Sequence, residues 1–175
     1  MSTPHLRPAV AADMGTVADI WHAAWHLAHA GHVPDGLTAA RTLEAFHART
    51  PLRVDDTTVA EVDGRVVGFI MIAGDEVEQV FVDLDHHGTG VAAPLLAEAE
   101  RQVAAAGHDE AWLAVVTGNA RARRFYEKHG WRDGGDLPYE VTAGGTTYVS
   151  PCRRYVKRLS TAGTSAPSAP TSPDT

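Results

Sequence analysis

The fold of this chain is decided by the stretch Val80-Phe-Val-Asp-Leu-Asp-His-His-Gly-Thr-Gly-Val-Ala-Ala-Pro-Leu-Leu96. Its first residues are β-branched and aromatic, a composition typical of a buried strand. Its last residues begin an apolar series at helical spacing, which continues through Ala99, Val103 and Ala106. A Gly-containing loop, residues 87–92, lies between the two. The stretch therefore predicts a strand, a tight loop and a helix in succession.

A helix that begins directly after such a loop is suited to bind an anion. Its first-turn N–H groups have no intrahelical partner, and the helix dipole adds about half a positive charge. Phosphate is the usual ligand of such a site. The glycines do not form G-x-x-x-x-G-K-[ST], because no Lys follows Gly90, nor G-x-G-x-x-G, because Ala93 takes the last position. The loop alone leaves two readings, a phosphate site or an ordinary strand-to-helix turn.

A second stretch follows one helix later. Residues 111–116 read as a strand, and residues 118–131 read as a loop and a helix. The first stretch resembles the acyl-CoA pyrophosphate loop [RQ]-x-x-G-x-[GA] of the GNAT superfamily of N-acetyltransferases, with His87 in place of the usual Arg or Gln. The second resembles the superfamily's N-x-x-A-x-x-[FL]-Y-x-x-x-G-[FW], which is matched in order by Asn119, Ala122, Phe125, Tyr126, Gly130 and Trp131. The resemblance covers most of residues 5–159 and is firmest over 76–131.

The composition narrows the class of protein. The chain has 175 residues and a net charge of −7, which argues against the basic patch that nucleic acid needs and against membrane adsorption. Its single cysteine, Cys152, excludes an internal disulfide and fits a reducing compartment. No apolar run is long enough to span a bilayer, and no secretory signal is visible. We predict a cytoplasmic protein that binds neither nucleic acid nor membrane.

The remaining elements predict a single mixed α/β (α+β) domain over residues 1–159. We expect helices near 17–28, 38–49, 90–106 and 119–129, and strands at 5–8, 57–62, 65–73, 76–82 and 111–116. A strand from Trp131, a hairpin over 139–149 and a last strand over 152–159 complete the order. The resemblance implies a central mixed, mostly antiparallel sheet with helices on both faces, in which strands 76–82 and 111–116 run parallel and splay apart. Residues 160–175 have almost no bulky side chains and predict a disordered tail.

The resemblance implies acetyl-CoA as co-substrate. Backbone N–H groups of Gly88, Thr89, Gly90, Val91 and Ala92, with His87 beside them, would hold its pyrophosphate, and backbone groups of Val80 and Val82 would pair with its pantetheine arm. Asn119 is a good helix N-cap, to which the resemblance adds a contact with the cofactor. Tyr126 matches the residue that protonates the departing thiolate. A packing role for Tyr126 on its helix is the alternative.

The acceptor side is less marked in the sequence. Glu76 and Glu78 share parity on the strand that leads into the loop, so both are expected on one face. We predict Glu78 as the general base and Glu76 as a substrate contact, with solvated strand positions as the alternative. Trp25 and His26 lie on the first helix, a region that shapes the acceptor pocket in the family. His22, His26 and His29 share a helix face, but no acidic ligand belongs to that pattern, and no metal is expected.

The sequence therefore predicts an acyltransferase, an N-acetyltransferase that moves an acetyl group from acetyl-CoA to a primary amine by direct attack in a ternary complex. The acceptor is expected to be a small molecule or a peptide amine. Two alternatives stay open, namely a non-catalytic acyl-CoA-binding sensor and an acyltransferase for a longer acyl-CoA. The resemblance also suggests a homodimer, which the sequence leaves open.

Overall fold

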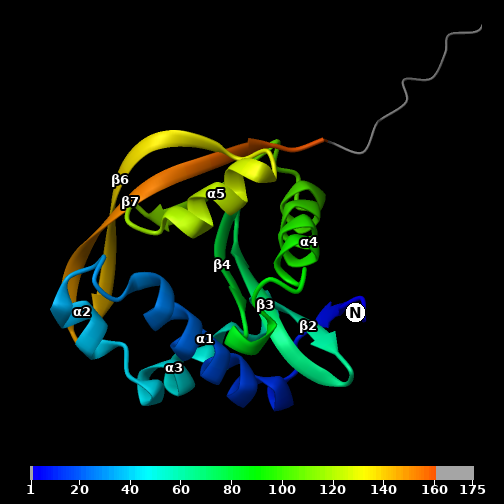
Figure 1. The fold of residues 1–175 in the computed structure, drawn as a ribbon, viewed down its shortest axis with the longest axis horizontal. Coiled ribbons are helices and arrows are strands. Elements are labelled where there is room, and N and C mark those ends of the chain that lie inside the picture. Colours follow the sequence, from blue (N-terminus) through cyan, green and yellow to red (C-terminus); the bar gives the residue numbers. More distant parts are fainter. Residues whose placement is uncertain (1, 161–175) are drawn as a thin grey trace, which may run out of the picture.

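Strand β4 (Glu76–Val82) is the middle strand of a seven-stranded sheet that has helices on both faces. Helix α4 (Ala92–Ala105) follows β4 in the chain and packs on one of those faces. The computed structural model describes residues 2–160, so the predicted tail beyond Ser160 lies outside the described residues. Within that range the other strands are β1 (His5–Pro8), β2 (Thr57–Val62), β3 (Arg65–Ala73), β5 (Glu110–Val116), β6 (Arg132–Ala143) and β7 (Thr146–Arg158). The other helices are α1 (Met14–His29), α2 (Asp35–Ala40), α3 (Leu43–Arg49) and α5 (Ala120–Lys128) (Figure 1).

The sheet has the order β1-β2-β3-β4-β5-β7-β6 and is antiparallel except between β4 and β5. Those two strands run parallel and pair only where Glu76 lies opposite Trp112, so they diverge beyond that point. The mixed, mostly antiparallel sheet with a splayed parallel pair is the predicted fold, which the structure confirms. None of the helices formed by residues 2–160 is long and apolar enough to cross a membrane.

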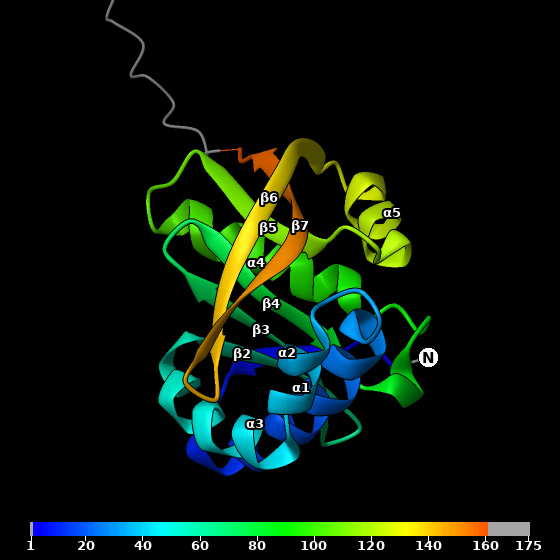
Figure 2. The same cartoon turned by 90° about the vertical axis from the view of Figure 1, so that its left-hand side faces the viewer.

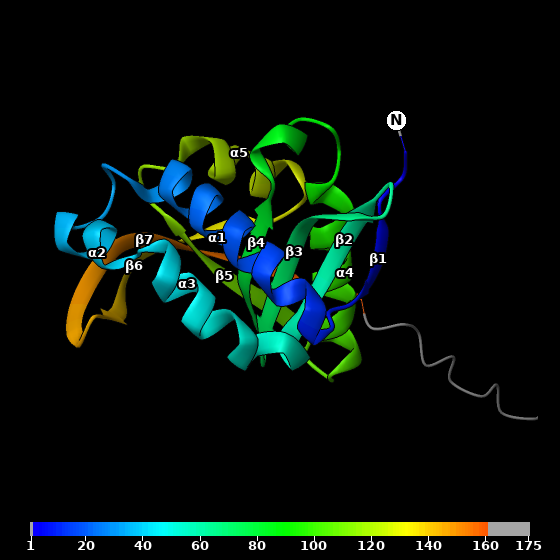
Figure 3. The same ribbon diagram turned by 90° about the horizontal axis from the view of Figure 1, so that it is seen from below.

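Alternation along the strands builds a separate core on each face of the sheet. Val59 and Phe69 pack with α1 and α3, whereas their neighbours Ala60 and Ile70 pack with α4. This is the period of two that a strand imposes on its side chains. Figure 3 shows α1 and α3 over one side of the strands, with α4 behind them.

A β-bulge at Glu78 interrupts that alternation in β4. Met71 of β3 pairs with Gln79 and Ile72 pairs with Val77, so Glu78 is the extra residue. Val77 and Val82 both belong to the core on the α4 face, although an unbroken strand would place odd and even positions on opposite faces. The bulge therefore reverses which face the side chains of residues 76–77 point to, relative to an unbroken strand.

Two predicted element boundaries are wrong. The single helix expected over 38–49 is two helices, because the chain turns at Arg41 and Thr42 caps α3 by accepting a hydrogen bond from the Ala45 N–H (3.1 Å). The three strand segments expected after Trp131 are two long strands joined at Gly144-Gly145, which curve across the molecule toward α2 (Figure 2). Pro138 and Pro151 lie opposite each other in the register, and the ladder continues on both sides of them.

Candidate active site

The loop between β4 and α4 has the geometry of an anion site. Gly88 and Gly90 have φ angles of 75° and 87°, a conformation in which other residues are strained. Helix α4 begins at Ala92, directly after the loop. Its first-turn N–H groups are therefore available to a ligand.

His87 connects this loop to both β4 and α5. Its Nε2 lies 2.9 Å from the carbonyl oxygen of Val82, and its Nδ1 lies 3.2 Å from Nη1 of Arg121. Because a guanidinium can only donate, Nδ1 accepts from Arg121, and Nε2–H donates to Val82. His87 thus bridges β4 and α5, and Arg121 brings a positive charge to the loop.

Beyond Glu76, the edge of β4 that faces β5 has backbone groups with no strand partner, although the Val82 carbonyl oxygen accepts a hydrogen bond from His87. The Asp83 N–H donates to Val67 of β3 at 2.8 Å. Backbone groups point alternately to the two sides of a strand, so those of Val80 and Val82 point away from β3. They face the opening left by the divergence of β4 from β5.

A cavity of about 660 Å³ joins these features. It extends from the end of β4 and the glycine loop to α5 and α1. Every residue predicted to hold the cofactor borders it except Thr89, which is exposed and donates its hydroxyl to the His86 carbonyl oxygen (2.6 Å). Asn119 also caps α5 as expected, accepting a hydrogen bond from the Ala122 N–H at 3.1 Å.

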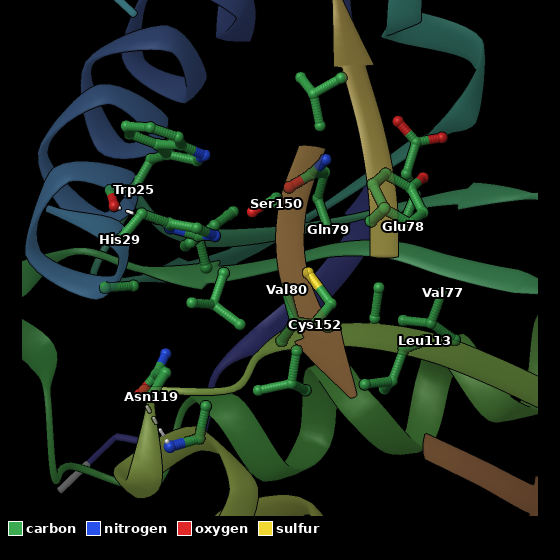
Figure 4. A pocket seen from close by; sticks show the side chains of 18 of the residues that line it. Trp25, His29, Val77, Glu78, Gln79, Val80, Leu113, Asn119, Ser150 and Cys152 are labelled. Carbon is green, nitrogen blue, oxygen red and sulfur yellow. Dashed lines mark hydrogen bonds between the residues drawn. The ribbon is translucent and has the colours of Figure 1, made fainter. Parts of the chain in front are cut away.

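A second cavity of about 340 Å³ adjoins the first. Trp25 and His29 of α1 stack on one side of it with ring centroids 4.6 Å apart, and Ser150 and Cys152 of β7 lie opposite, with Asn119 at one end (Figure 4). Burial lowers the pKa of His29 to about 4, so its imidazole is neutral at pH 7.

Tyr126 borders both cavities, together with Val80 and Asn119. It projects from α5 beside the diverging strands, and burial raises the pKa of its phenol. Its hydroxyl makes no hydrogen bond to any group of residues 2–160 and is free to meet a ligand. Tyr126 is therefore placed where molecules bound in the two cavities meet.

Both predicted carboxylates face the smaller cavity. Glu78 is held by Arg53 through two hydrogen bonds of 2.7 and 3.2 Å. Glu76 accepts one hydrogen bond, from the Tyr139 hydroxyl at 3.0 Å. Burial raises the pKa of Glu76, more than the Tyr139 hydrogen bond lowers it. Glu76 therefore accepts a proton more readily than an exposed glutamate does.

One predicted acceptor residue does not reach either cavity. His26 Nε2 lies 2.6 Å from the backbone carbonyl oxygen of Arg41, and its ring packs between His22 and Trp25. His29, one turn further along α1, borders the smaller cavity, where His26 was expected. Within residues 2–160 no group of three His, Cys, Asp or Glu side chains could hold a metal ion.

Several residues that line the smaller cavity were not predicted from the sequence. Arg41 and Arg49 line the smaller cavity from the ends of α2 and α3, and Tyr139 comes from β6. These residues belong to no motif. A signal for Arg41 was its place just before the capping Thr42, which marks a helix boundary and not a helix interior.

Comparison with known proteins agrees with this geometry. Residues 19–131 match the acetyltransferase (GNAT) family. An uncharacterized N-acetyltransferase of Mycobacterium tuberculosis is 35% identical over 119 residues, which covers 65% of this chain and 74% of that protein. The chain therefore belongs to the GNAT family of acetyltransferases and is an acyltransferase enzyme. The predicted family and enzyme class are confirmed.

Solved structures share the fold. A GCN5-related N-acetyltransferase from Rhodopseudomonas palustris superposes with a TM-score of 0.75 at 24% identity, over 91% of this chain and 98% of that one. PaiA N-acetyltransferase from Thermoplasma acidophilum, solved with coenzyme A, gives 0.71 at 18% identity, over 90% and 100%. YncA from Salmonella typhimurium, solved with acetyl-CoA, gives 0.63 at 19% identity, over 99% of both chains.

Proposed function

We propose that this protein transfers the acetyl group of acetyl-CoA to a primary amine by direct attack within a ternary complex. The observation that carries the proposal is the meeting of two cavities at Tyr126. The larger offers backbone N–H groups and Arg121 to a phosphorylated cofactor, and the smaller offers carboxylates to an amine. Both substrates can therefore be bound together, and no acyl-enzyme is needed.

The larger cavity supports acetyl-CoA as the donor. The N–H groups of the first turn of α4, directly after the glycine loop, suit the pyrophosphate, and the backbone groups of Val80 and the Val82 N–H suit the pantetheine amides. The donor supplies an activated acetyl carbonyl. The amine forms a bond to the carbonyl carbon as the bond to sulfur breaks. Side chains of the protein must take one proton from the amine and give one to the departing thiolate.

We assign the proton given to the departing thiolate to Tyr126. Its hydroxyl is unbonded within residues 2–160, and its raised pKa keeps it protonated. We assign the proton lost by the amine to Glu76, because Glu78 is occupied by Arg53 on both oxygens. Glu78 would then have a positioning role: its ion pair with Arg53 holds the wall of the smaller cavity in place.

The test is thiol release from acetyl-CoA with a panel of amines, comparing wild type with Tyr126→Phe. Loss of the acid should lower kcat about tenfold or more while acetyl-CoA affinity, measured by calorimetry, stays the same. Tyr148→Phe is the matched control, since Tyr148 borders neither cavity. Unchanged turnover in Tyr126→Phe would remove the role.

The two alternatives predict different results in the same assay. A sensor would bind acetyl-CoA and release no thiol with any amine. An enzyme for a longer acyl group would release thiol faster from propionyl-CoA or succinyl-CoA. The cytoplasmic location and the homodimer stay predictions.

A further inference from the structure

The smaller cavity contains two arginine side chains that no carboxylate of the described chain neutralises directly. Arg41 lies between α2 and α3, and Arg49 ends α3. Arg41 is only 7% exposed, and its Nε has no hydrogen-bond partner among residues 2–160. Arg49 is half-buried, with its guanidinium 4.6 Å above the Trp21 ring.

Two other partly buried arginines, Arg7 and Arg53, are paired with carboxylates. Arg7 bonds to both Asp13 and Glu61, and Arg53 bonds to both Glu78 and Asp56. An isolated cation removed from water is costly, and proteins compensate for it with a carboxylate or a ligand. Since no residue within 2–160 supplies that carboxylate at Arg41, a ligand is the remaining source.

The surroundings of Arg41 are rich in donors. Trp21 Nε1 is buried in the same cavity wall and also lacks a partner within the described chain. Burial, followed by the repulsion of Arg49, lowers the pKa of Arg41 to about 10, so it stays charged at pH 7. A group with several acceptor oxygens and a negative charge complements this wall.

We propose that Arg41 and Arg49 bind a carboxylate of the acceptor, so that the substrate is a small molecule carrying both a primary amine and a carboxylate. The inference rests on the proposed acetyl transfer and specifies its acceptor. Glu76, on the β4 side of the cavity, suits the ammonium end of such a molecule. The cavity volume, about 340 Å³, fits a molecule of the size of an amino acid.

A matched substrate series tests the charge requirement. An α-amino acid active in the thiol-release assay is compared with its carboxamide, its decarboxylated amine and its aminophosphonate analogue. We expect kcat/KM for the free acid to exceed that for the amide and the amine at least about tenfold. A preferred aminophosphonate would replace carboxylate with phosphonate as the ligand. Equal kcat/KM across the series would overturn the proposal.

Variants locate the effect. Arg41→Gln should raise KM for the acid about tenfold to a hundredfold and leave KM for the amide and the affinity for acetyl-CoA unchanged. Arg49→Gln, at a less buried site, should change KM in the same direction. Arg65→Gln, an exposed arginine in the β2–β3 hairpin, is the control. Equal loss for acid and amide in both cavity variants would show a structural role only.

Calorimetry separates this proposal from the proposed function. If no amine of the panel releases thiol, but the wild type binds one of the panel's α-amino acids and Arg41→Gln does not, acetyl transfer fails and the carboxylate site stands. If thiol is released and neither variant changes selectivity, acetyl transfer stands and the carboxylate site fails.

Discussion

Glu76 is a single residue whose environment suits it to a proton transfer. Because burial raises its pKa, Glu76 takes up a proton at a higher pH than an exposed glutamate does. The rate should therefore rise with pH as Glu76 loses its proton and becomes a base. Glu76→Gln should lower kcat about tenfold or more and abolish this rise, as measured by a pH–rate profile with saturating acetyl-CoA.

Glu78→Gln is the matched comparison, because both side chains face the same cavity. We expect it to keep the rise with pH and to lower stability instead, since Arg53 would lose its bidentate partner. If Glu78→Gln abolishes the rise and Glu76→Gln does not, the base is the residue expected from the sequence alone.

The glycine loop and helix α5 are joined through one contact. Arg121 donates to His87, which in turn donates to the end of β4. We expect Arg121→Gln to raise the Kd for acetyl-CoA about threefold to tenfold and to weaken its dependence on salt, because a cation near the phosphates is lost. Titration calorimetry at two salt concentrations measures both effects.

Arg124→Gln controls for the general loss of charge on α5. Arg124 is exposed and borders neither cavity, so its removal should leave the affinity nearly unchanged. Equal weakening by the two variants would mean that Arg121 acts only through the net charge of the helix.

Elements with strong local patterns were predictable from the sequence. Strands β2, β3 and β4 match their expected bounds, because each contains β-branched residues and has a Gly turn on at least one side. The bulge at Glu78 was not predictable, because it is defined by pairing with β3 and leaves no mark in the order of residues. The full length of β6 and β7 was not predictable, because it is defined by the pairing of the two strands with each other and not by a local run of β-branched residues.

The folding equilibrium of the whole molecule should depend on the charge of His29. Burial lowers its pKa from 6.5 to about 4, and Arg41, His26 and His32 add repulsion, opposed by the hydrogen bond to the Trp25 carbonyl. The unfolded state thus takes up a proton that the folded state refuses, so stability is complete above pH 6.5 and is lost toward pH 4.

Urea denaturation measures this loss. Between pH 7 and pH 5 the free energy of unfolding should fall about 2 kcal/mol more for the wild type than for His29→Gln. His5→Gln, at an exposed position on β1, should behave as the wild type does. An equal fall in all three proteins would assign the pH dependence to titratable groups other than His29.

At the scale of the whole molecule, the sequence predicts the donor half of the site better than the acceptor half. The cofactor residues are contiguous in two motifs, so local order already brings most of them together. The acceptor cavity is assembled by distant contacts, such as Tyr139 with Glu76 and Arg53 with Glu78. Such contacts follow from how β6 curves and where α3 ends, and neither is encoded by a short pattern.

Cys152 on the wall of the smaller cavity has a practical consequence. It is the only cysteine of the chain, it is buried, and burial raises the pKa of its thiol. A protonated, enclosed thiol is alkylated slowly, so the protein contributes little background when free coenzyme is detected with a sulfhydryl reagent. An acceptor resting against β7 would slow the alkylation of Cys152 further. Its labelling rate thus gauges occupancy of the cavity even when no acetyl donor is present.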